Sequence, residues 1–161
     1  MDKNQTWINN GFKITSVDLL GAAVNEDVPS NNTPIGHAIR DVVVKFFNLY
    51  DPRDVMLLQE YRPSEAHDAL GLTGAYSVIH PSNYAEQDVE SYKMQLQDAN
   101  GTAQPDCLDN QVPYTWVWNG FVWVYTATDN HCGYMDFRDP LNWNSIVSDG
   151  AMGSVMASWQ P

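Results

Sequence analysis

The sequence predicts an α/β fold with a parallel sheet at its centre and helices packed against it. Two apolar and β-branched segments, residues 12–24 and 43–50, are typical of strands that are buried on both faces of a parallel sheet. Between them, residues 35–44 begin with the composition of a helix before β-branched residues take over. An alternation of strand, helix and strand is the order found in α/β folds with a parallel core.

Length and charge limit the domain organisation and the partners. The 161 residues fit a single domain, residues 1–161, and an apolar share of 43% is sufficient for a core of ordinary size. Asp and Glu outnumber Lys and Arg by 20 to 8, which leaves a net charge of −12. Such a chain is repelled by nucleic-acid phosphates and by anionic lipid headgroups. We therefore expect no nucleic-acid partner and no membrane partner.

The compartment is not determined by the sequence. No segment has the length and apolarity of a transmembrane helix, and the first residues lack the apolar stretch of a secretory signal, so a cytoplasmic location is the default expectation. Cys107 and Cys132 are consistent with one disulfide in an oxidising compartment or with two free thiols, and both alternatives stay open.

Three further segments complete the predicted fold. Gly, Pro, Asn and Asp punctuate residues 60–113, which predicts a loop-rich excursion with one short helix near residues 84–96. Apolar residues at helical spacing behind a Ser-Asp start predict a terminal amphipathic helix over residues 148–159. Residues 6–11, TWINNG, have the composition of the end of a helix.

A β-hairpin is the strongest local prediction. Two aromatic and β-branched segments, residues 114–118 and 121–126, flank an Asn-Gly pair, which is the sequence preferred by a two-residue type I′ turn. The alternating rings could form a stacking platform for a sugar. Because one face of a hairpin must pack on the core, we expect about half of the rings to be structural. The rings belong to Tyr114, Trp116, Trp118, Phe121, Trp123 and Tyr125.

Two carboxylates and one imidazole are the candidate catalytic groups. Asp51 and Asp54 lie just beyond the second predicted strand, and His131 lies in a loop a few residues after the second hairpin arm. Functional groups in open α/β sheets gather beyond the carboxyl ends of the strands. A carboxylate that binds one imidazole nitrogen fixes the tautomer in which the other nitrogen accepts a proton from a nucleophile.

Structural interpretations of the same residues remain open. Asp51 and Asp54 flank a proline turn, where Asp is favoured simply because its side chain caps the turn backbone. His131 could equally satisfy a backbone carbonyl. No catalytic role is expected for the remaining histidines, which are His37, His67 and His80.

Taken together, these segments resemble the C-terminal half of an α/β-hydrolase-fold protein. The segments ITSVDLLGAAV, FFNLYDPRDVMLL, ALGLTGA and TDNHCGYMDF, followed by the terminal helix, are most similar to a group of largely uncharacterised α/β hydrolases common in archaea. The resemblance covers nearly the whole chain and implies a partial α/β-hydrolase-like parallel sheet. The acid precedes the base in such proteins. The resemblance therefore implies that Asp54 is the acid and His131 the base of a catalytic triad, with Asp51 as the alternative acid.

The chain departs from this family at the nucleophile. No G-x-S-x-G sequence is present, and in this fold the nucleophile elbow precedes the first strand visible here. We therefore expect the chain to begin downstream of the catalytic serine, to be inactive alone and to expose the outer edge of its first strand. The expected partners are the missing N-terminal half or a second copy, and the substrate of the completed enzyme would be a small ester.

A second hypothesis is an acidic module that binds carbohydrate or calcium and has no catalytic activity. It would use the aromatic hairpin and an acidic loop formed by Asp98, Asn100, Asp106 and Asp109. That loop loosely resembles the start of a calcium loop but lacks the closing glutamate, so no cofactor is the primary expectation. The hydrolase hypothesis differs in one geometric respect: it places Asp54 and His131 within hydrogen-bond reach at one edge of a parallel sheet.

Overall fold

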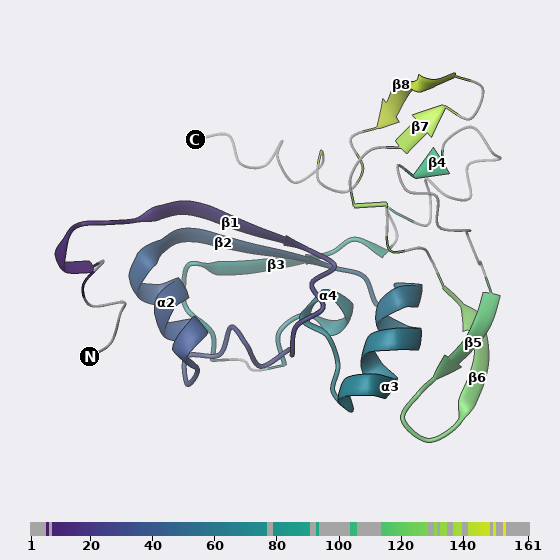
Figure 1. Cartoon of the computed structure of the whole chain (residues 1–161), viewed down its shortest axis with the longest axis horizontal. Coiled ribbons are helices and arrows are strands. Elements are labelled where there is room, and N and C mark those ends of the chain that lie inside the picture. The colour runs from purple at the N-terminus through teal and green to yellow at the C-terminus, as the bar shows by residue number, and fades with distance from the viewer. Residues whose placement is uncertain are drawn as a thin grey trace.

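A computed structural model describes residues 6, 8–76, 79–90, 93, 104–105, 114–128, 131, 133–134, 137–139, 142–148, 150 and 153. Its centre is a parallel sheet of three strands in the order β1-β2-β3 (Figure 1). The strands are β1 (Ile14–Leu20), β2 (Val43–Tyr50) and β3 (Tyr84–Asp88). The expected mixed α/β content and parallel sheet are therefore confirmed.

The helix α2 (Pro34–Val42) connects β1 to β2, as the sequence predicts. Thr33 caps its first turn, because the Thr33 hydroxyl accepts a hydrogen bond from the Gly36 amide at 2.9 Å. Pro34 occupies the first helical turn, where no amide hydrogen is needed. The helix ends at Val42 because Val43, the first residue of a β-branched pair, is already extended.

One face of the sheet is covered by α2 and by the short helix α4 (Leu70–Thr73), which lie on the same side of the strands in Figure 1. This covered face contains the main core, in which Phe46 and Tyr84 stack with their ring centroids 5.6 Å apart. Burial of this apolar surface holds the helices to the sheet. The buried members of the cluster are Ile39, Val43, Phe46, Leu70 and Tyr84.

The opposite face is covered mainly near the carboxyl ends of the strands, where Leu49 packs with Val89 and Tyr134. No residue of β1 is buried, so the expectation that this strand is buried on both faces is wrong. The physical reason is its place in the sheet: among the described strands β1 pairs with β2 alone, at an edge. The expected unpaired outer edge of the first strand is thus present in the described part of the chain.

Residues 84–88 form a strand, so the short helix predicted near residues 84–96 is wrong over that part. This strand, β3, pairs in parallel with β2, from Phe46 opposite Tyr84 to Tyr50 opposite Asp88. Helical backbone is found at Glu90 and Lys93. The strand was missed because Tyr84 is its one buried residue, so it has no apolar alternation. It takes the third position in the sheet, and the hairpin forms a separate sheet.

The predicted hairpin is confirmed as β5 (Tyr114–Trp118) and β6 (Trp123–Ala127), but its turn differs. The connection spans residues 119–122, and the Asn119 side-chain oxygen accepts hydrogen bonds from the amides of Phe121 and Val122, each at 3.0 Å. A type I′ turn needs positive φ at both central residues, whereas here Gly120, at 97°, has positive φ and Asn119 does not.

All the strand aromatics of the hairpin lie on one face, because the register sets Trp116 opposite Tyr125 and Trp118 opposite Trp123. The other face packs through Val117, which is 3% exposed, against the π-helical segment η1 (Leu57–Tyr61). The expectation that half of the rings are structural is therefore wrong. The rings more than half exposed are Tyr114, Trp116, Phe121, Trp123 and Tyr125.

The remaining named elements are one short helix and three strands. The helix α3 (Arg62–Glu65) continues η1. The strands β4 (Gln104–Pro105), β7 (Phe137–Asp139) and β8 (Asn142–Ser148) form an antiparallel sheet that the sequence did not predict.

Helical backbone occurs near both ends of the chain. Thr6, Ile8 and Asn9 are helical, as expected, and Gly11 has a φ of 71° directly after this helical end. Gly150 and Gly153 are helical, but Ser148, the expected start of the terminal helix, is the last residue of β8, so the prediction is wrong at that residue. The other residues of the predicted helix lie outside the described residues. In the described part of the chain, no helix has the length and apolarity needed to cross a membrane.

Leu70 tests the core described above. We expect Leu70→Ala to lower the free energy of unfolding by about 2–5 kcal/mol, because it leaves a cavity in the cluster that joins α4 to the sheet. Urea unfolding followed by circular dichroism measures the change. Ile79→Ala is the matched control, since it removes an aliphatic side chain that is 56% exposed and should cost no more than about 0.5 kcal/mol. Equal losses in the two variants would contradict this packing.

Candidate functional site

The candidate site begins where β2 ends. The chain leaves the strand at Tyr50 and turns, with the Asp54 amide donating to the Asp51 carbonyl at 3.2 Å. The Asp51 amide donates to the Gly71 carbonyl at 2.9 Å, which ties the turn to α4. Both carboxylate side chains are completely buried at this carboxyl edge of the parallel sheet. Pro52 lies between them and fixes φ in the turn.

Asp54 uses its two carboxylate oxygens for two different purposes. Its Oδ1 accepts hydrogen bonds from the amides of Met56 at 3.1 Å and Leu57 at 3.2 Å, which caps the helical segment that follows. Its Oδ2 lies 2.7 Å from His131 Nδ1. The capping role expected from the turn and the imidazole contact expected from the catalytic hypothesis are therefore both present in one side chain.

His131 meets Asp54 across 77 residues of sequence. The expectation that the two lie within hydrogen-bond reach at the edge of a parallel sheet is confirmed. Because a carboxylate only accepts hydrogen bonds, His131 Nδ1 must carry the proton that it shares with Asp54. In the neutral ring, Nε2 then has the lone pair and can accept a proton from a nucleophile or a water. The His131 side chain is 37% exposed, so the pair joins a buried anion to a partly exposed base.

Lys93 neutralises part of the negative charge behind the pair. Its ammonium is completely buried, 2.7 Å from Asp51 Oδ2 and 4.0 Å from Asp54 Oδ2. It also lies 3.9 Å from the centre of the Tyr134 ring, a cation–π contact. Asp51, the alternative acid, is thus placed against Lys93, whereas Asp54 binds the imidazole. Two carboxylates and one ammonium leave a single net negative charge, which stabilises an imidazolium at His131.

Two glycines allow the close packing around the imidazole, and the sequence analysis missed both. A Cβ on Gly21, which has a φ of 54° at the end of β1, would lie 3.0 Å from His131 Cε1 and 2.7 Å from Tyr134 Cε2. A Cβ on Gly71 would lie 2.1 Å from the Ala22 amide nitrogen. The sequence signal was the run of small residues that closes the first strand, GAA. It marks a close approach of backbone and ring.

Tyr134 closes the site from the face opposite α2 and is 3% exposed. Its hydroxyl lies 3.4 Å from Asp54 Oδ2 and 3.5 Å from the Gly71 carbonyl oxygen, so it can donate to either. Its ring meets the His131 ring edge-on at 6.1 Å between centroids. Tyr134 therefore restricts both members of the pair, although nothing in the sequence analysis singled it out.

The other candidate residues lie elsewhere. His37 and His67 are exposed, and His80 packs on the Tyr84 ring with a centroid distance of 4.9 Å. No group of three metal-ligating side chains occurs among the described residues. The acidic-loop residues and both cysteines fall outside the part that the structure describes; they are Asp98, Asn100, Asp106, Asp109, Cys107 and Cys132.

Comparison with known proteins gives no relative from which a role for this site could be transferred. No protein-family model, curated protein or solved structure matches the chain. The interpretation of the site therefore depends on its geometry.

Lys93 provides a test of the buried charges. We expect Lys93→Met to lower the free energy of unfolding by about 3–5 kcal/mol, because it leaves Asp51 and Asp54 buried without a cation. Urea unfolding at neutral pH measures this loss, and adding Asp51→Asn to the variant should recover part of it. Lys45→Met is the control, since Lys45 is exposed on β2. A Lys93→Met protein as stable as the parent would contradict the ion pair.

Proposed function

We propose that this chain supplies the acid and the base of a Ser-His-Asp-type hydrolase that acts on ester or related acyl bonds. Asp54 orients His131, and His131 activates a serine that this chain does not provide in a G-x-S-x-G sequence. Asp54 and His131 would then be the acid and the base of an α/β-hydrolase-like domain. The observation that carries this proposal is the 2.7 Å contact between the buried Asp54 carboxylate and the partly exposed His131 ring.

The place of the pair in the fold also favours a catalytic role. Asp54 follows the central strand of a parallel sheet, and Gly21, at the end of the neighbouring strand, approaches the imidazole. Reactive groups collect at such an edge because the loops that follow parallel strands converge there. The chain order of acid and then base is the order found in α/β hydrolases.

The proposal requires a nucleophile from another segment, and β1 offers a place for it. A further strand running parallel to β1 on its outer side would lie about 5 Å away, and its carboxyl end would reach the same edge as Gly21 and Asp54. In α/β hydrolases the serine occupies a sharp turn between such a strand and the following helix. The segment could come from the polypeptide encoded immediately upstream, and a second copy of the chain is the alternative way to cover this edge.

Active-site labelling tests the function. The full chain is co-expressed with the polypeptide encoded immediately upstream, treated with a serine-directed fluorophosphonate and assayed with nitrophenyl esters. We expect labelling of the upstream polypeptide and ester hydrolysis, and His131→Ala or Asp54→Asn should slow hydrolysis roughly 10⁴-fold. Asp54→Asn retains a side-chain oxygen for the helix cap, so its effect reports on the lost charge.

His37→Ala is the matched control, because His37 is exposed on α2, and it should leave hydrolysis unchanged. The melting temperature of His131→Ala should stay close to that of the parent protein. Retained hydrolysis in His131→Ala, accompanied by a lower melting temperature, would mark His131 as a structural residue. Absence of labelling from a folded, co-purified pair would contradict the proposal.

A further inference from the structure

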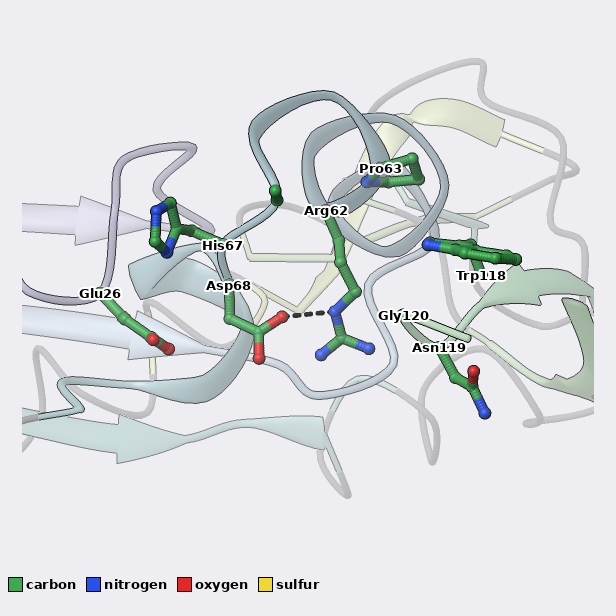
Figure 2. A pocket seen from close by; sticks show the side chains of 9 residues that line it. Glu26, Arg62, Pro63, His67, Asp68, Trp118, Asn119 and Gly120 are labelled. Carbon is green, nitrogen blue, oxygen red and sulfur yellow. Dashed lines mark hydrogen bonds and ion pairs between the residues drawn. The ribbon is translucent and has the colours of Figure 1, made fainter. Parts of the chain in front are cut away.

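A second concave site lies away from Asp54 and His131, between the tip of the hairpin and the end of α3. We call it the hairpin-tip pocket; its volume is about 440 Å³, within the range of small-molecule sites. Figure 2 shows Arg62 and Asp68 at its centre, Glu26 on one side, and Trp118 and Asn119 on the other. The pocket thus combines charged groups with an aromatic wall.

Hydrogen bonds hold the charged side chains of the pocket in place. Arg62 Nε donates a hydrogen bond to Asp68 Oδ1, which leaves the terminal guanidinium nitrogens as donors that the planar group presents together. Glu26 Oε2 accepts a hydrogen bond from the Thr73 hydroxyl at 3.1 Å. Burial, together with the charge of the neighbouring Asp68, raises the pKa of Glu26. The pocket therefore offers donors and acceptors within one cavity.

The aromatic wall of the pocket continues along the exposed face of the hairpin. The rings of Trp118 and Trp123 lie 5.7 Å apart between centroids, and those of Trp116 and Tyr125 lie 5.4 Å apart. Tyr114 stacks on Tyr125 at 6.0 Å and ends the row. This row of five rings, which we call the aromatic strip, extends from the pocket toward the base of the hairpin. Four of its five rings are more than half exposed.

The combination of pocket and strip favours one class of ligand. An apolar protein surface would strip water from Glu26, Arg62 and Asp68 without replacing their hydrogen bonds, which is costly. A nucleic acid or an acidic glycan would meet the net charge of −12. The hydroxyl groups of a neutral sugar both donate and accept, so they can pair with all of these side chains. The apolar C–H face of a sugar ring can lie flat on an aromatic side chain.

We infer that the hairpin-tip pocket and the aromatic strip form a binding site for a neutral oligosaccharide. One sugar ring occupies the pocket against Trp118, with its hydroxyls bonded to the polar groups, and the following rings lie along the strip. The inference uses none of the residues of the proposed hydrolase site, so either can fail without the other.

Calorimetric titration and saturation-transfer NMR of the full chain test the site. The probes are cellotriose, maltotriose and chitotriose, with trigalacturonate as the anionic comparison. We expect saturable binding of at least one neutral trisaccharide with a dissociation constant of about 1 mM or below. Trp116→Ala, which removes an exposed ring of the strip, should weaken this binding roughly three- to tenfold.

Trp118→Ala and Glu26→Gln should weaken the same binding at the pocket. Glu26→Gln keeps the shape of the side chain and an oxygen that accepts the hydrogen bond from Thr73. This variant therefore tests the pocket even if Trp118→Ala does not fold. Tyr76→Ala is the matched control, because this aromatic side chain is 77% exposed and does not belong to the hairpin. The Tyr76→Ala variant should bind the trisaccharide with the same affinity as the parent chain. Tighter binding of trigalacturonate, no saturation by any neutral probe, or affinities unchanged in both Trp116→Ala and Glu26→Gln would overturn the inference.

Discussion

The Asp54 carboxylate is the group on which the rest of the site depends, because its two oxygens connect two parts of the fold. Oδ1 begins the helical segment that carries Leu57 and Leu58 toward the hairpin. Oδ2 accepts a hydrogen bond from the Nδ1 of His131, which lies 77 residues later in the chain. A neutral side chain could fulfil the first role almost as well. A carboxylate is needed for the second, since only an anion both fixes the imidazole tautomer and stabilises the imidazolium.

Burial of the charged groups around Asp54 costs free energy, which favours a functional interpretation of the site. Two carboxylates and the Lys93 ammonium are completely buried together, although an apolar cluster of the same volume would often be at least as stable. Buried ionisable groups of this kind collect at functional sites more often than elsewhere. Lys93 offsets one of the two negative charges, and the remaining one faces His131. The fold therefore maintains a net anion behind a partly exposed base.

The strand register of the hairpin separates a packing face from an exposed aromatic face. Because aromatic residues pair with aromatic residues across β5 and β6, every strand ring lies on one face. The opposite face has small and aliphatic side chains, and from it Val117 packs against η1, where Gln59 donates hydrogen bonds to the Thr115 hydroxyl and to the Trp116 carbonyl. The aromatic face is consequently exposed to solvent next to the polar pocket at the hairpin tip, and it is the face that we infer to bind an oligosaccharide.

The sequence by itself determined the elements whose signal is local. The apolar runs of β1 and β2, the helix between them, the hairpin and the turn that holds Asp51 and Asp54 follow from periodicity and turn chemistry over a few residues. Only the tertiary structure decided the rest, because it depends on contacts between distant residues. Residues 84–88 form the strand β3 because they pair with β2. The Lys93 side chain is buried because it forms an ion pair with Asp51. Position 21 needs a glycine because His131 and Tyr134 pack closely against it. The resemblance had already favoured Asp54 over Asp51, and the tertiary structure agrees, because His131 binds Asp54 while Lys93 pairs with Asp51.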